Sequence, residues 1–308
     1  MAGDVVNFKV YFPLKLRSGL TRKKPAICHY SYNLPSPPIL MKKILKYSWT
    51  LLVFLLLTVI SQIGGIVYLL SLWISNKINI KFRFKILLVF FVLYVLTTFL
   101  VIPLIAPLGG REKIIQTSNL KPVSILTNIL NRNYVRKEMN SFLLNVSNEL
   151  KRQDNRIQLR YLDACFPFFN GFPLFPHLSH NDGKKIDFSL IYQDKNGNIV
   201  NKSKSISGYG VFEEPKAGEV NQTQACKEKG YFQYDFPKYL TFGRINRDLV
   251  FSEQGTRLLV MTLLNQKELN KIFIEPHLKN RMNLNNEKIR FHGCKAVRHD
   301  DHIHVQIQ

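Results

Sequence analysis

The sequence predicts an α+β domain with an antiparallel sheet, preceded by two transmembrane helices. Two long apolar runs, residues 49–74 and 86–108, contain no charged residue. From residue 110 on, the composition is that of a soluble domain, and several segments alternate apolar and polar residues as half-buried strands do. Strands of this kind, mixed with amphipathic helices and joined by a hairpin turn, are typical of α+β folds.

Each apolar run exceeds the about 20 residues that a helix needs to cross the hydrocarbon core of a bilayer. The apolar part of a cleaved signal peptide is shorter, about 7–15 residues. We therefore expect three regions: a basic N-terminal tail at 1–47, in which Met41 is a candidate translation start, a membrane region at 48–109 with spans at about 49–74 and 86–108, and a soluble domain at 110–308.

The charges beside the two apolar runs predict their orientation. The loop between them carries four basic residues, against three before the first run and two after the second (Lys77, Lys81, Arg83, Lys85; Lys42, Lys43, Lys46; Arg111, Lys113). Cytoplasmic loops are enriched in Lys and Arg, so the loop is predicted to be cytoplasmic and both termini to lie outside. The margin is one or two charges, and the opposite orientation stays open.

The whole chain is basic, with 43 Lys and Arg against 21 Asp and Glu. Residues 1–110 carry 13 basic and 1 acidic residue, and residues 111–308 carry 30 and 20. The first excess surrounds apolar segments and suits anionic lipid head groups. The second is spread evenly, without a zinc-finger spacing or a basic-aromatic recognition motif, which argues against nucleic-acid binding and favours polyanionic surroundings.

Periodicity and turn residues predict the elements of the soluble domain. One or two helices are expected within 123–152 and another at 252–264, while 221–229 is expected to be a loop. Strands are expected at 157–169, 185–192, 271–274 and 302–307. The Asn-Gly pair at 196–197 predicts a hairpin turn before Ile199.

Five of the eight histidines fall into two clusters, His177-x-x-His180-x6-Asp187 and His299-x-x-His302-x-His304. In a strand that begins at His302, the side chains at 302, 304 and 306 share one face and those at 303, 305 and 307 enter a core. Asp187 likewise stands on the strand face opposite its apolar neighbours at 186 and 188. The two clusters could therefore meet on one face of a sheet.

Two imidazoles and one carboxylate could hold a zinc ion, because catalytic zinc sites use three protein ligands and leave a fourth position open. His180, Asp187 and His304 meet this requirement, and Gly183 suits the tight turn that carries His180 back beside Asp187. His302, not itself a ligand, could accept a proton from a water molecule whose pKa the metal lowers to about 7. The acids at 300 and 301 either orient ring N–H groups or are exposed turn residues.

The pair His-x6-Asp and His-x-His resembles the zinc peptidases that include lysostaphin-type endopeptidases, D-Ala-D-Ala carboxypeptidases and Hedgehog domains. The additional His177 and His299 make residues 160–308 most similar to the penicillin-insensitive murein endopeptidases. Leu178 and Lys185 replace a serine and a small residue that the carboxypeptidases have, which favours the endopeptidase version. The two membrane segments are not part of that family's usual pattern.

The resemblance implies a zinc metallo-endopeptidase that hydrolyses D-amino-acid-containing peptide cross-links of peptidoglycan. Together with the two apolar runs, it predicts a protein of the bacterial inner membrane. The catalytic domain would face the periplasm or cell wall, with peptidoglycan peptides and the lipid bilayer as partners; the oligomeric state is left open. The resemblance gives His180, Asp187 and His304 the role of Zn2+ ligands and His302 that of catalytic histidine. His177 and His299 would support the site.

Simpler explanations accompany these assignments. A lone His-x-His is a weak signal, and only the joint occurrence of both clusters indicates a metal. His177 and His299 could equally serve loop structure, and His277 and His292 are expected to be ordinary surface or core residues. Two alternative functions therefore stay open: a non-catalytic zinc-binding domain for cell-wall recognition or signalling on the same scaffold, and a membrane scaffold with incidental histidines.

The four cysteines form no CxxC pair, which argues against a thiolate zinc site. One disulfide among Cys165, Cys226 and Cys294 is expected if the domain is exported, and buried free thiols are the equally weighted alternative. The sequence contains no GxSxG element and no cysteine in a catalytic context, which argues against a serine or cysteine nucleophile.

Overall fold

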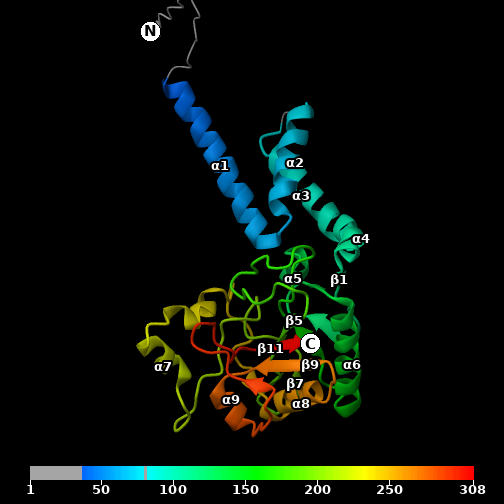
Figure 1. Ribbon diagram of the computed structural model, residues 1–308, viewed down its shortest axis with the longest axis vertical. Coiled ribbons are helices and arrows are strands. Elements are labelled where there is room, and N and C mark those ends of the chain that lie inside the picture. The colour runs from blue at the N-terminus through cyan, green and yellow to red at the C-terminus, as the bar shows by residue number, and fades with distance from the viewer. Residues whose placement is uncertain (1–36, 80–81) are drawn as a thin grey trace, which may run out of the picture. The chain divides into compact units, whose positions relative to one another are not determined.

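The computed structural model describes residues 37–79 and 82–308 (Figure 1). Contacts divide the described chain into two units, one that ends at Val53 and one that comprises Phe54–Gln308. Most of the predicted tail at 1–47 lies outside the described residues. Helix α1 (Pro37–Ser61) begins near the end of that segment and contains Met41.

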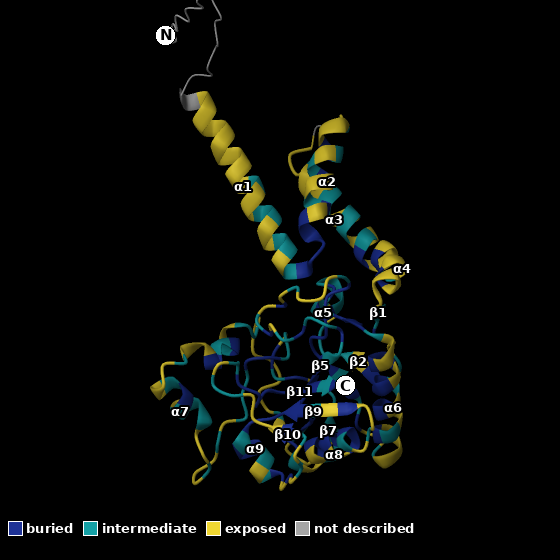
Figure 2. Ribbon diagram, in the orientation of Figure 1, coloured by how far each residue is buried: buried dark blue, intermediate teal, exposed yellow. Residues whose placement is uncertain are grey.

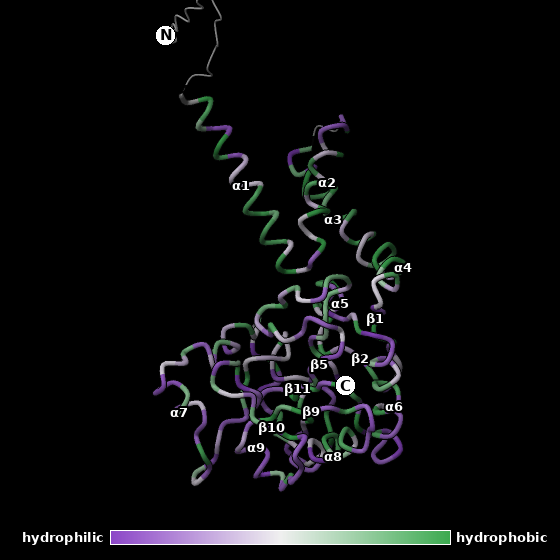
Figure 3. The backbone as a smooth tube through the Cα atoms, viewed as in Figure 1, coloured by the Kyte–Doolittle hydropathy of each residue, from purple (hydrophilic) through white to green (hydrophobic). Residues whose placement is uncertain are grey.

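Two helical stretches are long and apolar enough to cross a bilayer, as the sequence predicts: Ile39–Ser61 and Lys85–Gly109. Their residues are hydrophobic and largely exposed, which suits contact with lipid (Figures 2 and 3). The second stretch is built from consecutive segments, α3 (Lys85–Leu96), the π-helix η1 (Thr97–Val101), α4 (Ile102–Ile105) and the 3-10 helix η2 (Ala106–Gly109). Pro103, which lacks an N–H, follows the π-helical segment and accounts for the irregularity there.

The prediction of one span at 49–74 is wrong, because the helix ends inside that run. Gln62 adopts a left-handed backbone conformation, with φ of 66°. The chain then reverses into α2 (Gly64–Lys77), where the hydroxyl of Ser61 accepts a hydrogen bond of 3.1 Å from the backbone N–H of Gly64. A Cβ on Gly65 would lie 2.6 Å from the carbonyl oxygen of Phe54, so only glycine lets the two helices approach this closely.

The soluble domain is built on a six-stranded sheet in the order β10-β9-β11-β5-β4-β2. The central strands β9 (Leu269–Phe273), β11 (His302–Ile307), β5 (Lys185–Ser189) and β4 (Leu159–Tyr161) are antiparallel to one another. The outer strands β10 (Ile289–Arg290) and β2 (Leu120–Pro122) pair in parallel with β9 and β4. The sheet is therefore mixed, and the prediction of a purely antiparallel sheet is wrong.

The hydrophobic core lies between one face of this sheet and two helices, α6 (Lys137–Gln153) and α8 (Glu253–Leu264) (Figure 2). Helix α6 buries a stripe with helical spacing that includes Met139, Phe142, Val146 and Leu150, as its amphipathic pattern predicts. Strand β11 contributes its apolar residues at 303, 305 and 307, and β5 those at 186 and 188. Loops cover the opposite face, so the strand expected to be half buried is buried on both faces.

The hairpin turn agrees with the sequence, and further small elements complete the domain. The turn at 194–198 joins β6 (Tyr192–Gln193) to β7 (Ile199–Val200), with Gly197 at a φ of 84°. Together with β8 (Val250–Phe251) these strands form a second sheet, and β1 (Glu112–Lys113) pairs with β3 (Tyr134–Val135). The remaining helices are α5 (Ile125–Ile129), α9 (Pro276–Arg281) and the 3-10 helix η3 (Phe232–Tyr239).

Two local predictions are wrong. The segment expected to be a loop at 221–229 contains helix α7 (Gln222–Glu228), capped by the Asn221 side chain, which accepts a 2.9 Å hydrogen bond from the backbone N–H of Gln224. A short capped helix without an apolar stripe leaves no periodic signal. The strand expected over 157–169 is reduced to β4. Leu162 and Asp163 still exchange backbone hydrogen bonds with Asp187, and the chain then passes into loops.

Candidate metal centre

The register of two neighbouring strands brings the two histidine clusters together. Strand β11 pairs antiparallel with β5 so that His304 stands directly opposite Asp187 and His302 opposite Ser189. Residues opposite each other in an antiparallel pair point to the same face of the sheet. The polar face of β11 and that of β5 therefore form one surface beneath the covering loops.

His180 reaches this surface from the turn before β5. Its backbone N–H bonds to the carbonyl of His177 at 3.0 Å, which folds the segment into a tight turn. Gly183 continues the turn with a φ of 80°, as the sequence predicts for this position. Its N–H donates to the Cys165 thiol at 3.1 Å, so a buried sulfur atom fixes the turn beside the sheet.

The three residues predicted as metal ligands meet at one point. His180 Nε2 lies 2.9 Å from His304 Nδ1 and 3.1 Å from Asp187 Oδ1, and His304 Nδ1 lies 2.8 Å from the same carboxylate oxygen. All three side chains are buried. Donor atoms that bind one ion at about 2.1 Å in a tetrahedron are roughly 3.4 Å apart. A small outward adjustment of these atoms would therefore make room for a metal ion.

A third histidine approaches the other oxygen of the same carboxylate. Nδ1 of His177 lies 3.1 Å from Asp187 Oδ2. The ligand atoms of His177, His180 and Asp187 all lie within 4.8 Å of one another, and the three residues are buried. The structure thus contains a buried His-His-Asp group that could hold a metal ion, with His304 beside one carboxylate oxygen and His177 beside the other.

Hydrogen bonds around the group leave Nε2 of His180 free to bind a metal. His180 Nδ1 faces the carbonyl oxygen of Ala164 at 2.8 Å, and because a carbonyl only accepts, Nδ1 carries the proton and Nε2 presents a lone pair. The Tyr209 hydroxyl donates to Asp187 Oδ2 at 2.8 Å, which engages that oxygen and leaves Oδ1 toward His180 and His304. Such partners orient metal ligands in known sites.

Burial and neighbouring imidazoles set the protonation of the group. Burial alone would raise the pKa of the Asp187 carboxyl, but the histidines around it lower this pKa well below its usual value. Burial lowers the pKa of His304 to about 3. A deprotonated carboxylate and a neutral imidazole are the forms that coordinate a metal.

His302, the predicted catalytic histidine, lies on the Oδ2 side of the carboxylate. Its Nε2 is 3.7 Å from Asp187 Oδ2, and no group among residues 37–79 and 82–308 hydrogen-bonds to it. Its Nδ1 contacts Oδ1 of Asp301, which orients the ring. Burial lowers the pKa of His302, but the charges of Asp187 and Asp301 outweigh this and raise it to about 9.

The two acids at 300 and 301 are buried, so their interpretation as exposed turn residues is wrong. Asp301 also accepts a hydrogen bond from the backbone N–H of Gly210, and Asp300 forms an ion pair with Arg298. Both acids therefore support the segment that carries the second histidine cluster. The pKa of Asp300 is raised well above its usual value because burial outweighs the charge of Arg298.

His299 lies behind His302 rather than beside the carboxylate, with the two ring centroids 4.8 Å apart. Its backbone N–H donates to Glu275 at 3.0 Å, and the Tyr234 hydroxyl donates to the same oxygen at 2.6 Å. Glu275 is thus a buried anchor of the loop before β11. His292 stacks nearby, with its ring centroid 5.4 Å from that of His299.

Sequence reasoning missed Tyr209, which contacts the carboxylate directly. It stands between Gly208 and Gly210, with φ angles of 88° and 78°. Glycines on both sides of a residue allow the backbone to adopt positive φ angles there. This pattern is common in loops and does not identify a site. A Cβ on Gly208 would clash with Leu162, and one on Gly210 with the Pro237 carbonyl, so close packing requires both glycines.

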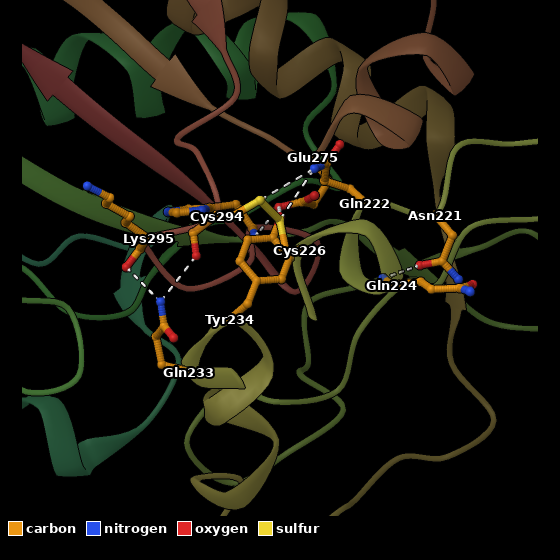
Figure 4. Close-up of a disulfide and its surroundings, with 10 residues drawn as sticks. Asn221, Gln222, Gln224, Cys226, Gln233, Tyr234, Glu275, Cys294 and Lys295 are labelled. Carbon is orange, nitrogen blue, oxygen red and sulfur yellow. Dashed lines mark hydrogen bonds between the residues drawn. A yellow bond between two sulfur atoms is a disulfide. The ribbon is translucent and has the colours of Figure 1, made fainter. Parts of the chain in front are cut away.

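A disulfide between Cys226 and Cys294 joins α7 to the loop that leads to the second histidine cluster (Figure 4). Gln233 donates to the carbonyls of Cys294 and Lys295, at 3.3 and 3.4 Å, and strengthens the same connection. Cys165 is a buried free thiol. The described residues therefore contain both the disulfide and the buried free thiol that the sequence left as alternatives.

No protein-family model matches the chain, and no curated protein matches it. The geometry of the buried group and the sequence motifs that form it are therefore the features that bear on function.

Proposed function

We propose that the chain is a membrane-anchored zinc metallo-endopeptidase that hydrolyses D-amino-acid-containing peptide cross-links of peptidoglycan. The observation that supports this most is the convergence of His180 Nε2, Asp187 Oδ1 and His304 Nδ1 within 3.1 Å of one another on one buried face. Residues 117 and 124 positions apart in the sequence meet there, which a chance distribution of histidines does not explain.

The donor set favours zinc among the common ions. Two imidazole nitrogens and one carboxylate oxygen form a three-ligand set that leaves a fourth position, the pattern of catalytic zinc sites. We assign His180, Asp187 and His304 as the residues that hold the ion. When bound, zinc would polarise a peptide carbonyl and increase the acidity of water.

The chain's own residues would position the reacting groups. Asp301 fixes the ring of His302 through Nδ1, so Nε2 points toward the carboxylate side of the centre and is free to hold or transfer a proton. Tyr209 and His177 engage Asp187 Oδ2 and keep Oδ1 directed at the ligand histidines. His299, packed behind His302, limits movement of that ring.

The substrate class follows from the resemblance and agrees with the charge of the domain. Residues 111–308 carry 30 basic against 20 acidic residues, and murein is a polymer rich in carboxylates. Its peptides lie outside the cytoplasmic membrane, so the domain must be exported. The Cys226–Cys294 disulfide supports an oxidising compartment, since such bonds are rare in the cytosol.

Cleavage of purified cross-linked murein by the full chain in detergent, followed by separation of muropeptides, tests the proposal. We expect the His302→Ala variant to retain zinc and lose cleavage, and the His304→Ala variant to lose both. Zinc binding by the wild-type chain without cleavage of any muropeptide would instead indicate the non-catalytic recognition domain. A wild-type chain that binds no zinc would leave a membrane scaffold.

A further inference from the structure

The last candidate membrane helix enters the soluble domain without a linker. Leu108, in η2, is 88% exposed, whereas Arg111, three residues later, is 1% exposed. Gly110 makes the turn between them with a φ of 73°, and the N–H of Arg111 bonds back to the carbonyl of Ala106 at 3.2 Å. The lipid-compatible surface of the helix therefore ends where the domain begins.

Arg111 fixes this junction to the loops beside the metal centre. Its guanidinium donates to the carbonyl of Phe166, to Oδ1 of Asn170 at 2.7 Å and to the carbonyl of Asn181 at 3.0 Å. Asn181 directly follows His180. Separating a buried cation from these oxygens would cost free energy, so Arg111 fastens the helix end to the loop at 166–181.

Further contacts join the helices to the same side of the domain. The hydroxyl of Tyr94, in α3, donates to the carbonyl of Ile129 at 2.9 Å, and the Phe168 N–H donates to Oε1 of Gln62 at 2.9 Å. A small apolar cluster fills the space between (Ile63, Val67, Ile102, Ala106 and Tyr134, with Phe90, Leu93, Tyr94 and Phe168). In Figure 1, α5 lies on the side of the domain from which α3 and α4 emerge.

Two large apolar side chains beside these contacts are open to solvent. Phe169, whose neighbour Phe168 packs in the cluster, is 67% exposed, and so is Ile125 at the start of α5. Lys113 lies at the same junction, with Nζ 5.2 Å from the ring centroid of Phe99 in the membrane helix. Exposed apolar side chains, and a lysine at a helix end, are typical of residues at the level of lipid head groups.

We propose that the face formed by α5 and the loop at 168–170 docks on the lipid head-group layer, with Ile125 and Phe169 inserted into it. This proposal rests on the membrane placement of the proposed function. A domain of this length has a diameter of roughly 40 Å, so a docked domain reaches peptides within that distance of the bilayer. Its substrate class is then membrane-proximal peptide, such as newly made or lipid-linked murein, rather than distant layers.

Site-specific fluorescence of the full chain in vesicles of phosphatidylethanolamine and phosphatidylglycerol tests the docking. In a Cys28→Ser background, cysteine is introduced by Ile125→Cys or Phe169→Cys and labelled with the polarity-sensitive dye NBD; the buried Cys165 stays unlabelled. Leu104→Cys, on the exposed side of α4, is the control for a lipid-embedded position. Phe232→Cys, 76% exposed at the start of η3, is the control for a water-exposed position.

We expect NBD emission maxima at 125 and 169 to lie between those at 104 and 232. Head-group spin-labelled lipid should quench the dyes at 125 and 169 more strongly than those at 104 and 232. Emission at 125 and 169 equal to that at 232 would overturn the docking while leaving the membrane helix in place. Water-like emission at 104 would overturn the membrane placement itself, and the docking with it. Murein cleavage by the same variants is measured separately, so failure of the proposed activity is recognised independently of both.

Discussion

The Tyr209 hydroxyl donates a 2.8 Å hydrogen bond to Oδ2 of Asp187, the oxygen that faces away from His180 and His304. This bond leaves Oδ1 as the oxygen that the carboxylate would present to a metal. We predict that Tyr209→Phe lowers metal affinity by about 10–100-fold, the usual effect of removing an outer partner of a ligand. Competition with a fluorescent zinc chelator measures the change.

Tyr161→Phe is the matched control for this variant. Tyr161 is also a fully buried tyrosine, but its hydroxyl faces Asn128 at 3.5 Å and not the carboxylate. It should leave metal affinity unchanged. Equal affinities for wild type and Tyr209→Phe, with both variants folded by circular dichroism, would show that Tyr209 does not position Asp187.

The two histidines on opposite sides of the carboxylate should differ in their importance. We expect His304→Ala to abolish stoichiometric zinc binding, because Nδ1 of His304 lies 2.8 Å from the carboxylate oxygen shared with His180. His177→Ala should weaken binding only about 10–100-fold, as loss of an orienting contact does. Elemental analysis of the purified chains gives the stoichiometry, and the reverse ranking would make His177 the third ligand. His277→Ala, a buried histidine bonded to the Glu213 carbonyl, is the control.

Gly183 is required both by its backbone and by its surroundings. An added Cβ would lie 3.0 Å from Cγ and 3.1 Å from the backbone nitrogen of Arg136, at a φ of 80°. We predict that Gly183→Ala destabilises the domain by about 1–3 kcal/mol and moves His180 away from Asp187. Gly197→Ala isolates the backbone effect, since Gly197 has a φ of 84° but no atom within 4 Å of its Cβ position. Urea denaturation should show a smaller loss for Gly197→Ala, and equal losses would exclude a packing contribution.

The free thiol of Cys165 and the disulfide of Cys226 and Cys294 can be distinguished by alkylation and peptide mapping. Burial raises the pKa of Cys165 to about 11, so its thiol stays protonated at pH 8 and should resist alkylation until the protein is unfolded. Peptide mapping without reduction should recover Cys226 joined to Cys294 across 68 residues. Replacing that pair with alanines should cost about 2–5 kcal/mol of stability by chemical denaturation. Rapid alkylation of Cys226 in the native, unreduced chain would refute the disulfide.

The sequence predicts the parts of the site that depend on strand alternation. Alternation places His302 and His304 on one face of β11 and Asp187 on the matching face of β5, and the register then sets His304 against Asp187. Gly183 marks the turn because its φ is one that glycine adopts most easily. Local chemistry fixes the strand faces and the turn, so these can be read without a structure, whereas the register between β5 and β11 is a property of the fold.

Features that depend on distant packing could not be predicted in this way. Tyr209 contacts Asp187 from a loop with no periodic signal. Which two cysteines form the disulfide depends on how the fold brings them together. Gln62 interrupts an otherwise continuous apolar run because the Ser61 hydroxyl and two glycines stabilise a reversal, whereas hydropathy records only the run. The parallel pairing of β10 and β2 likewise depends on long connections rather than on residue type.

The carboxylate of Asp187 and the imidazole of His304 are separated by 117 positions of chain. An ion bound by both residues would link these two distant segments, and its binding free energy would add to the stability of the folded domain. Withdrawal of the ion would then favour opening of the sheet between β5 and β11 and expose it to proteases. The concentration of available metal in its compartment would in that way determine the lifetime of the protein against proteolysis, as well as its activity.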